Sequence, residues 1–294
     1  PASSPQPIAA APEGQAIVFD ADRAFADLKR QVEFGPRVPN LESHRECRKF
    51  LVDTLKPLAA EVTTQDFTRR VRGRSLSMSN IIATWPGNGG KQGVLLCAHW
   101  DTRPTADYEP DATRRRQPIP GANDGASGVA VLLEMARMFK RVPPSVPVMI
   151  VFFDGEDYGP GVDNMFLGSR YFADHLPPKT PRQGILLDMV GDRDLAIPQE
   201  EYSRRVAPEI IRDVYEIAHR RGYEKQFPAI PGTPIEDDHL SLHEKGLKVI
   251  DLIDFSYGPG HSWWHTLEDT PDKCSPASLK AVGDVVLEWV YRQK

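Results

Sequence analysis

Four short, mainly apolar runs constrain the fold of this chain more than any other feature. They cover residues 93–98, 146–153, 184–189 and 247–253. A continuous apolar run of this length is typical of a strand that is covered on both faces, because a strand with one face in water alternates apolar and polar residues. Helical patterns follow two of the runs, at residues 128–139 and 205–221. The sequence therefore predicts an α/β fold with a mixed, mainly parallel central sheet between two layers of helices.

Helical patterns also occur towards both ends of the chain. Residues 20–32 carry apolar side chains at helical spacing, and a second helix is predicted over residues 44–58. Near the C-terminus, Ser275 is the predicted N-cap and Pro276 the first residue of a helix whose apolar stripe should cover the sheet. Because the chain contains neither an internal repeat nor a second linker, we expect residues 16–294 to form one domain.

The first fifteen residues have a different composition. They are rich in Pro, Ala and Ser, beginning Pro1-Ala2-Ser3-Ser4-Pro5, and are predicted to be a disordered tether. One hypothesis is that this tether remains after removal of an export signal, which would make the protein periplasmic or secreted. An arbitrary chain boundary explains the segment nearly as well. No run approaches the roughly 20 apolar residues that span a bilayer, so we expect no membrane span.

Charge and cysteine content exclude several other classes. The formal net charge is -5 and no basic stripe dominates, which argues against nucleic acid as the main partner. The short basic run Arg114-Arg115-Arg116 is interpreted as a solvated loop. Three cysteines are too few and too irregularly spaced for a disulfide framework or a Cys-type zinc site. One disulfide with one free thiol is still compatible with that count.

Residues with metal-binding side chains follow or interrupt the apolar runs. They supply carboxylates and imidazoles, which are the ligands that zinc takes in catalytic sites. The loops at residues 108–120 and 158–166 also follow strand ends, where open α/β sheets build their sites. In chain order the motifs are His99-Trp100-Asp101, Gly121-Ala122-Asn123-Asp124, Glu156-Asp157, Asp188, Asp237-Asp238-His239 and Trp263-Trp264-His265-Thr266. Together they indicate a zinc enzyme with a separate carboxylate for proton transfer.

Each motif alone has an ordinary structural explanation. A histidine such as His99 at a strand end usually binds no ion, and Asp124 could simply cap the following helix. Glu156 and Asp157 could be solvated loop acids, although adjacent acids at the mouth of a buried strand are costly unless paired. A histidine beside two tryptophans, as His265 is, is more often packed than catalytic. Only the combination of motifs favours a metal site.

The ordered set resembles the zinc aminopeptidase superfamily, from Gly35-Pro36-Arg37-Val38-Pro39 to the C-terminal helix. The superfamily pattern is a His-x-Asp, a Gly-Ala-x-Asp, a pair of acids, an Asp-Met and a final His-Thr, and each part has a counterpart in this chain. Within the superfamily, the chain is most similar to the glutaminyl cyclases. The sequence motifs that show this similarity are Phe152-Phe153-Asp154-Gly155-Glu156-Asp157, Asp237-Asp238-His239 and Trp264-His265-Thr266.

This resemblance implies an enzyme that cyclises the N-terminal Gln of peptides and proteins to pyroglutamate and releases ammonia. By position, the resemblance places one zinc ion per chain on Asp124, Asp157 and His265. It makes Glu156 the residue that moves the proton from the α-amine to the departing ammonia. The partners would be peptides or proteins that begin with Gln, and we expect the enzyme to be a monomer.

The resemblance also implies roles for four further residues. Asp188 and Asp237 would orient Glu156 and bind the developing leaving group. Trp264, with Trp263 beside it, would form the wall of the substrate pocket. These roles, like the ligand set, come from the family and not from the spacing of the residues.

Three positions depart from the animal members of the family. Asp157 stands where animal cyclases have Glu, so this ligand is one methylene shorter. Asp251 stands where the animal enzymes place a His. Cys97 matches a cysteine that is bridged in animal enzymes, but its partner position holds Val129, so we expect that disulfide to be absent.

Two other functions stay open at this stage. The first is an aminopeptidase with two zinc ions, in which His99 and Asp188 would bind the second metal and Asp124 would bridge the pair. The second is a relative that has no catalytic activity and uses the fold for binding. The latter would be expected to have lost ligands or the acid Glu156, and this chain retains all of them.

Overall fold

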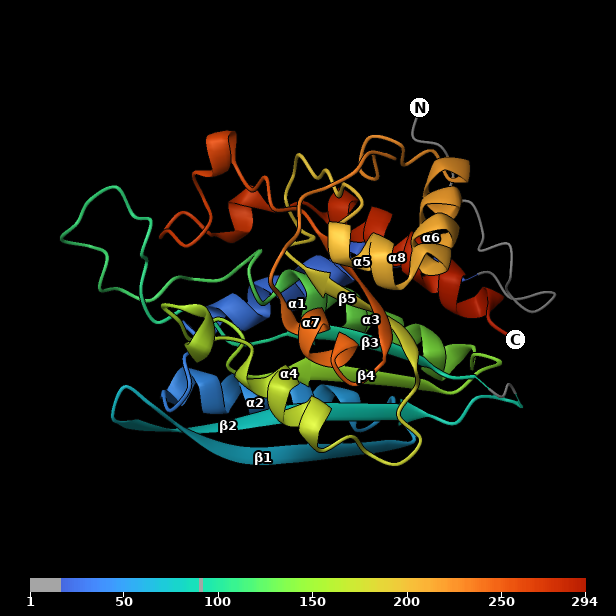
Figure 1. The fold of residues 1–294 in the computed structure, drawn as a ribbon, viewed down its shortest axis with the longest axis horizontal. Helices are drawn as coiled ribbons and strands as arrows, with labels where there is room; N and C mark the ends of the chain where they lie inside the picture. The colour runs from blue at the N-terminus through green and yellow to red at the C-terminus, as the bar shows by residue number, and fades with distance from the viewer. Residues whose placement is uncertain (1–16, 90–91) are drawn as a thin grey trace.

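The computed structural model describes residues 17–89 and 92–294, so the predicted tether at residues 1–15 lies outside the described residues. Its centre is a six-stranded sheet with the strand order β1-β2-β4-β3-β5-β6 (Figure 1). The strands are β1 (Glu61–Val71), β2 (Arg74–Trp85), β3 (Val94–His99), β4 (Val148–Phe153), β5 (Gln183–Asp188) and β6 (Lys248–Ile253).

The four predicted strands form the parallel half of this sheet. β3 pairs in parallel with β4 and with β5, and β5 pairs in parallel with β6. β3 and β4 are buried along their whole length, and β5 and β6 are buried after their first residue. The prediction of buried, mainly parallel strands is therefore confirmed. Because the strands are parallel, their carboxyl ends lie at one edge of the sheet, where β3 ends with His99 and β5 with Asp188.

The antiparallel half of the sheet is a hairpin that the sequence analysis missed. β1 pairs with β2 in antiparallel register, and β2 pairs with β4 in the same way. Arg72 and Gly73 form the two-residue turn with φ angles of 48° and 80°, the left-handed pair that hairpins favour. β1 is an edge strand with mostly exposed side chains, so no continuous apolar run marks it.

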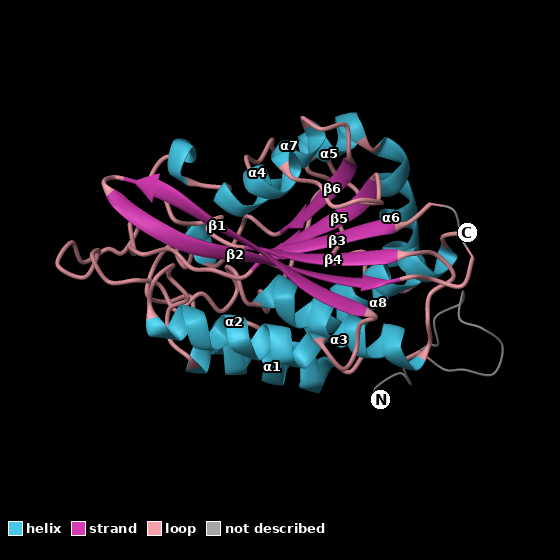
Figure 2. Cartoon of the chain, turned by 90° about the horizontal axis from the view of Figure 1, so that it is seen from below, coloured by secondary structure: helices cyan, strands magenta, loops and turns pink. Residues whose placement is uncertain are grey.

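Helices cover both faces of the sheet, as predicted (Figure 2). One face packs against α1, α2, α3 and α8, and the other packs against α4 and α7, while α5 lies beside β6 and α6 packs on α8. The helices are α1 (Ala21–Glu33), α2 (Glu42–Leu55), α3 (Ser127–Arg141), α4 (Leu167–Asp174), α5 (Glu201–Val206), α6 (Pro208–Arg220), α7 (Asp238–His243) and α8 (Pro276–Arg292).

The helix at the C-terminus and the helices after β5 test two of the predictions. The N-cap prediction is confirmed, because the Ser275 side chain accepts the backbone N–H of Ser278 and Pro276 begins α8. The helix predicted over residues 205–221 is present as α6, but it begins at Pro208, because the short helix α5 ends at Val206. The residue before a proline is disfavoured in the helical region, and Ala207 accordingly has φ -138° and ψ 56°.

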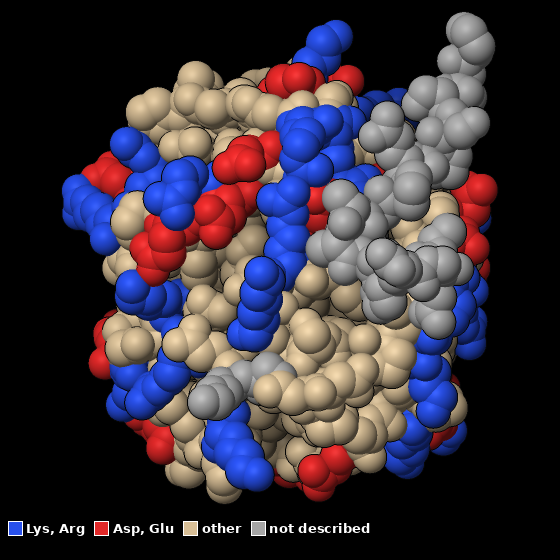
Figure 3. Space-filling model, turned by 90° about the vertical axis from the view of Figure 1, so that its right-hand side faces the viewer, with Lys and Arg blue, Asp and Glu red and all other residues tan. Residues whose placement is uncertain are grey.

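The three cysteines form no disulfide, and the surface carries charges of both signs. Cys47, Cys97 and Cys274 are all buried and unbridged, so the expected absence of a disulfide at Cys97 is confirmed. Within the described residues, no helix is both long and apolar enough to cross a membrane. On the face shown in Figure 3, basic and acidic side chains lie beside one another around an area of uncharged side chains, so that face does not carry a single sign of charge.

Candidate metal centre

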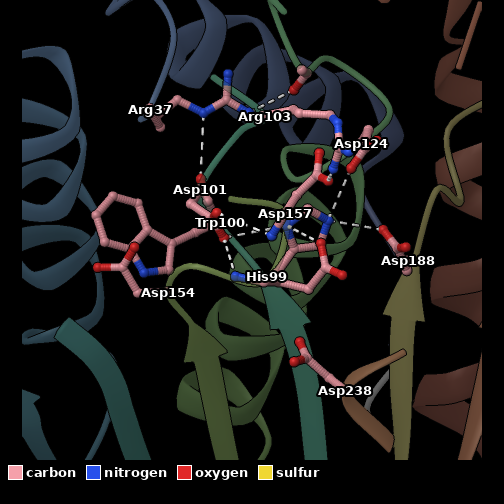
Figure 4. A network of polar contacts seen from close by, with 12 residues as sticks. Arg37, His99, Trp100, Asp101, Arg103, Asp124, Asp154, Asp157, Asp188 and Asp238 are labelled. Atoms are coloured by element: carbon pink, nitrogen blue, oxygen red, sulfur yellow. Dashed lines mark hydrogen bonds and ion pairs between the residues drawn. The ribbon is translucent and has the colours of Figure 1, made fainter. Parts of the chain in front are cut away.

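The predicted site residues come together at the carboxyl edge of the parallel strands. His99 ends β3 and Asp188 ends β5, while Glu156 and Asp157 follow β4. Asp124 precedes α3, and His265 reaches the same place from the loop before α8. All of these side chains are buried. Figure 4 shows the carboxyl groups of Asp124, Asp157 and Asp188 gathered around the end of β3.

Asp124, Asp157 and His265 form a compact triad. Each offers one ligand atom, and these atoms lie within 4.8 Å of one another. Nε2 of His265 lies 3.5 Å from Oδ2 of Asp124 and 3.3 Å from Oδ1 of Asp157. Oδ2 of Asp157 is buried without a hydrogen-bond partner. Carboxylates and imidazoles are among the ligands of zinc, and catalytic zinc sites use three protein ligands, so this triad is suited to holding a zinc ion.

The loop that carries His265 holds an uncommon backbone conformation. His265 has φ 52°, in the left-handed region that non-glycine residues rarely adopt. Its ring stacks on Trp264 with the centroids 3.7 Å apart, and its carbonyl oxygen accepts the backbone N–H of Tyr108 at 3.2 Å. Strained residues of this kind persist where the surrounding structure holds them, and they cluster at functional sites.

His99 lies at the centre of a second set of contacts. Its Nε2 lies 3.0 Å from Asp188 and 3.2 Å from Asp124, and its Nδ1 lies 3.6 Å from Oε2 of Glu156. Burial alone would lower the pKa of His99, but the charges of Asp188 and Glu156 raise it well above its usual value. Burial raises the pKa of Glu156 well above that of an exposed glutamate. Glu156 thus contacts His99 and stays outside the Asp124, Asp157 and His265 triad.

Asp101 supports the acidic loop, and its Oδ1 also lies 3.5 Å from Nδ1 of His99. Its two carboxylate oxygens accept the backbone N–H groups of Glu156 at 3.0 Å and Asp157 at 3.2 Å. Alternate residues of an extended strand share a side, so a segment that stayed extended after His99 would point Asp101 in the same direction as His99. The carboxylate turns towards the loop after β4, where buried N–H groups require acceptors.

Asp269 supports Asp124 in the same way. It accepts the N–H groups of Asn123 and Asp124 at 2.8 Å and 3.2 Å, and the hydroxyl group of Tyr257 at 2.7 Å. Burial, and then the charge of Asp124, raise the pKa of Asp269 to about 7. The segment before α3 lies close to the end of β3, and a Cβ on Gly125 would be only 3.2 Å from the His99 ring. Glycine at this position therefore allows the two segments to approach each other.

Arg103 contacts one member of the triad directly. Its Nη1 donates to Oδ1 of Asp157 at 2.6 Å, and its Nε donates to Asp107 at 2.7 Å. Burial favours the protonated form of Asp157, but the neighbouring His265 and Arg103 outweigh it and lower the pKa of this carboxyl. Arg103 therefore holds one oxygen of Asp157 and leaves the other unpartnered.

Asp237 belongs to a neighbouring buried cluster. It caps α7 by accepting the N–H of Asp238, and its other oxygen has no partner. Together with His239 and Asp251 it forms another group of potential ligands within 4.8 Å. Burial raises the pKa values of Asp237 and Asp251 well above the usual range, and the charge of Asp188 adds to the effect at both carboxyls.

The two predicted pocket tryptophans occupy different positions. Trp264 stacks on His265, whereas Trp263 packs against Tyr257 with the ring centroids 5.5 Å apart and lies under Lys273. A Cβ on Gly258 would collide with the Trp263 ring. The structure therefore brings Trp264 against the candidate ligand His265 and Trp263 against Tyr257.

Comparison with known proteins places the chain in a family. The profile of peptidase family M28 matches residues 80–290, which contain every member of the candidate metal centre. The chain belongs to peptidase family M28. This M28 chain is 30% identical over 211 residues to aminopeptidase YwaD of Bacillus subtilis, a match that covers 67% of the chain and 40% of YwaD. The chain thus spans less than half of the length of that relative.

Other M28 relatives are glutaminyl cyclases and similar proteins. A mouse glutaminyl-peptide cyclotransferase-like protein is 28% identical over 275 residues, covering 83% of this chain and 68% of the mouse protein. The crystal structure of Bacteroides thetaiotaomicron glutaminyl cyclase bound to N-acetylhistamine superimposes with a TM-score of 0.89. It is 40% identical, and the match covers 95% of this chain and all of that one. The resemblance inferred from the motifs is confirmed.

Sequence reasoning missed several residues that support this M28 site. Arg103 lies four residues after His99, but nothing in its spacing indicates a contact with Asp157. Asp269 lies in a polar loop and could not be distinguished from a solvated acid. Tyr108 lies in the loop at residues 108–120, which the sequence analysis singled out because it follows a strand. That position was the only sequence signal that indicated Tyr108.

Proposed function

We propose that this M28 enzyme converts the N-terminal Gln of peptides and proteins to pyroglutamate and releases ammonia, with one zinc ion per chain. The observation that carries this proposal is the separation of roles at the site. Asp124, Asp157 and His265 converge, while Glu156 lies beside them and outside their triad. The 40% identity to a solved glutaminyl cyclase over 95% of the chain supports the same reaction.

The donor set fits zinc. Two carboxylate groups and one imidazole are buried together, and Oδ2 of Asp157 lacks any other partner. Bound there, zinc would act as a Lewis acid towards the γ-amide carbonyl of the substrate. Arg103 and Asp269 hold Asp157 and Asp124 from behind, in the way that outer contacts orient metal ligands.

In the proposed reaction, Glu156 moves a single proton. The α-amine of the substrate attacks its own γ-amide carbon, so a ring C–N bond forms as the bond to the side-chain nitrogen breaks. Glu156 accepts a proton from the α-amine and donates it to the departing ammonia. Ring closure is intramolecular, so orientation supplies much of the rate enhancement. Asp101 fixes the backbone of Glu156 and thereby the position of its carboxylate.

Three further residues complete the proposed site. Asp188 holds His99 at 3.0 Å, and His99 in turn contacts Glu156, so Asp188 orients the shuttle through the imidazole. Asp237 provides a buried carboxyl with one free oxygen for the leaving group. Trp264 forms the wall of the pocket beside His265, and Trp263 packs on Tyr257, whose hydroxyl group donates to Asp269.

The test is ammonia release from a short peptide with N-terminal Gln. We expect release to stop with a chelator and to return with zinc. Glu156→Gln should lower kcat by about 10²- to 10⁴-fold with zinc still bound, whereas Glu224→Gln, at an exposed glutamate, should have no effect. Full activity of Glu156→Gln would refute the shuttle role.

A two-zinc aminopeptidase is the second candidate, because His99 and Asp188 are both present and lie 3.0 Å apart. Nε2 of His99 also lies 3.2 Å from Asp124, and His99, Asp124 and Glu156 form another group of potential ligands. Metal analysis separates the candidates, since one zinc per chain supports the cyclase and two support the peptidase. Cleavage of a Leu-amide reporter without ammonia release from Gln peptides would establish the peptidase.

We further propose that residues 16–294 act as one catalytic domain, that the enzyme is a monomer, and that it works in the periplasm or outside the cell. Mass spectrometry of the protein from its host tests the location, because an uncleaved cytosolic precursor would contradict export. A molar mass by light scattering that corresponds to two chains would contradict the monomer.

A further inference from the structure

An aromatic cluster extends from the candidate metal centre to the solvent. Trp264, stacked on His265, is flanked by Tyr108 with ring centroids 4.8 Å apart and by Phe255 at 5.1 Å. His261 lies 4.8 Å from Trp264 and 4.6 Å from Phe255. We call Tyr108, Phe255, His261 and Trp264 the aromatic rim. These residues come from two loops that are far apart in the sequence, so the rim exists only in the folded chain.

The rim exposes apolar surface that the fold leaves uncovered. Within the described residues, five large hydrophobic side chains are exposed, and two of them are Tyr108 at 60% and Phe255 at 37%. Both contact the same tryptophan. Isolated exposed apolar residues are ordinary, but several aromatic rings gathered beside a buried polar site mark a binding surface.

The loop that presents Tyr108 is held in place from the site. The Tyr108 N–H donates to the carbonyl oxygen of His265, and the neighbouring Asp107 accepts from Arg103, which also holds Asp157. Glu109 accepts the N–H of Leu267 at 3.1 Å and pairs with Arg114 at 3.2 Å. The two acids beside Tyr108 are therefore occupied by contacts within the protein, and neither carboxylate is free to recognise a charged ligand.

We propose that the aromatic rim is the subsite for the second residue of the substrate and that it favours aromatic side chains there. The inference rests on the proposed function, in which the α-amine and side chain of Gln occupy the metal centre. The peptide must then leave along the wall that Trp264 begins, so the next side chain lies between Tyr108 and Phe255. Aromatic rings pack on such a surface in offset or edge-to-face geometry. Each aromatic pair contributes more binding free energy than the burial of its apolar area alone.

The experiment measures kcat/KM for ammonia release from Gln-Phe-amide and Gln-Ala-amide. We expect the Phe peptide to be about tenfold better, as one or two aromatic pairs would give. Tyr108→Ala and Phe255→Ala should each reduce this ratio to about threefold or less. Tyr108→Phe keeps the ring and should keep the ratio. Ile230→Ala removes another exposed apolar side chain, one with no ring contact to the rim, and should change neither the ratio nor the activity.

The outcomes separate the subsite from the reaction. A wild-type ratio near one, or a ratio that survives both alanine substitutions, overturns the subsite while leaving the cyclase proposal intact. Absence of ammonia from both peptides overturns the cyclase proposal. In that case the same variants are assayed for cleavage of Leu-Phe-amide and Leu-Ala-amide, and a tenfold preference that depends on Tyr108 and Phe255 still supports the subsite.

Discussion

Replacement of Asp101 by Asn tests how the loop that carries Glu156, the proposed proton shuttle, is held. Asp101 is completely buried, and its two oxygens accept the backbone N–H groups of Glu156 and Asp157 at 3.0 Å and 3.2 Å. Asparagine has the same shape but only one acceptor oxygen. Its amide group would point a donor at one of the two N–H groups, so one hydrogen bond is replaced by two donors that face each other.

The size of the effect follows from these two bonds. A hydrogen bond to a charged acceptor contributes about 1.5–3 kcal/mol, and a buried donor without a partner costs about 1–3 kcal/mol. We therefore expect Asp101→Asn to lower the free energy of unfolding by about 2–4 kcal/mol, which is several degrees in Tm. If the loop moves by roughly 1 Å, misplacement of Glu156 should lower kcat by about 10²-fold.

Asp154→Asn is the matched control for this variant. Asp154 is equally buried and accepts from His44 at 2.9 Å and from the Ser79 N–H at 2.6 Å, but it does not bind the N–H groups of Glu156 or Asp157. Urea unfolding should show comparable destabilisation of the two variants. Ammonia release under conditions where both are folded should show the large loss of kcat only for Asp101→Asn. Equal losses of activity in both would refute the assignment of loop positioning to Asp101.

Four further predictions concern the metal, the packing and the pH dependence. Arg103→Lys keeps the positive charge but cannot contact both carboxylate partners, so zinc affinity should fall about 10- to 100-fold in a chelator competition; unchanged affinity would show that the guanidinium is dispensable. Gly128→Ala would place a Cβ too close to the carbonyl oxygen of Leu187, so urea unfolding should show a loss of stability despite the roughly 1 kcal/mol that Ala normally adds to a helix; a gain would mean that α3 can shift away from β5. Burial raises the pKa of Asp254 from 3.8 to about 6, so the folded chain binds this proton more tightly than the unfolded chain and stability declines as pH rises through that interval. The unfolding free energy of the wild type minus that of Asp254→Asn should fall by up to about 3 kcal/mol between about pH 4 and pH 7, and a difference that is independent of pH would contradict this account. Zinc at about a thousand times its Kd should stabilise the fold by ~4 kcal/mol, so chelation should lower Tm, and an unchanged Tm would argue against a site that forms only in the folded chain.

The sequence by itself determined the parallel half of the sheet and identified the motifs of the candidate metal centre. β3, β4, β5 and β6 are covered on both faces, and burial of both faces demands apolar residues at consecutive positions, which is a local pattern. The start of α8 was equally local, because Ser275 and Pro276 act within one turn. The motif order was sufficient to identify the family and to nominate Asp124, Asp157 and His265.

Tertiary structure alone decided how those residues are supported and what surrounds them. In the β1–β2 hairpin, β1 is an edge strand whose side chains are mostly exposed. The sequence of β1 therefore lacks the continuous apolar run that marks a buried strand. Arg103 meets Asp157 across 54 residues, and Tyr108 meets Trp264 across a longer separation. Such contacts depend on where each loop leaves the sheet and on which buried N–H group or carboxylate needs a partner there. Local propensity and periodicity contain no information about those partners, because the partners become neighbours only when the chain is folded.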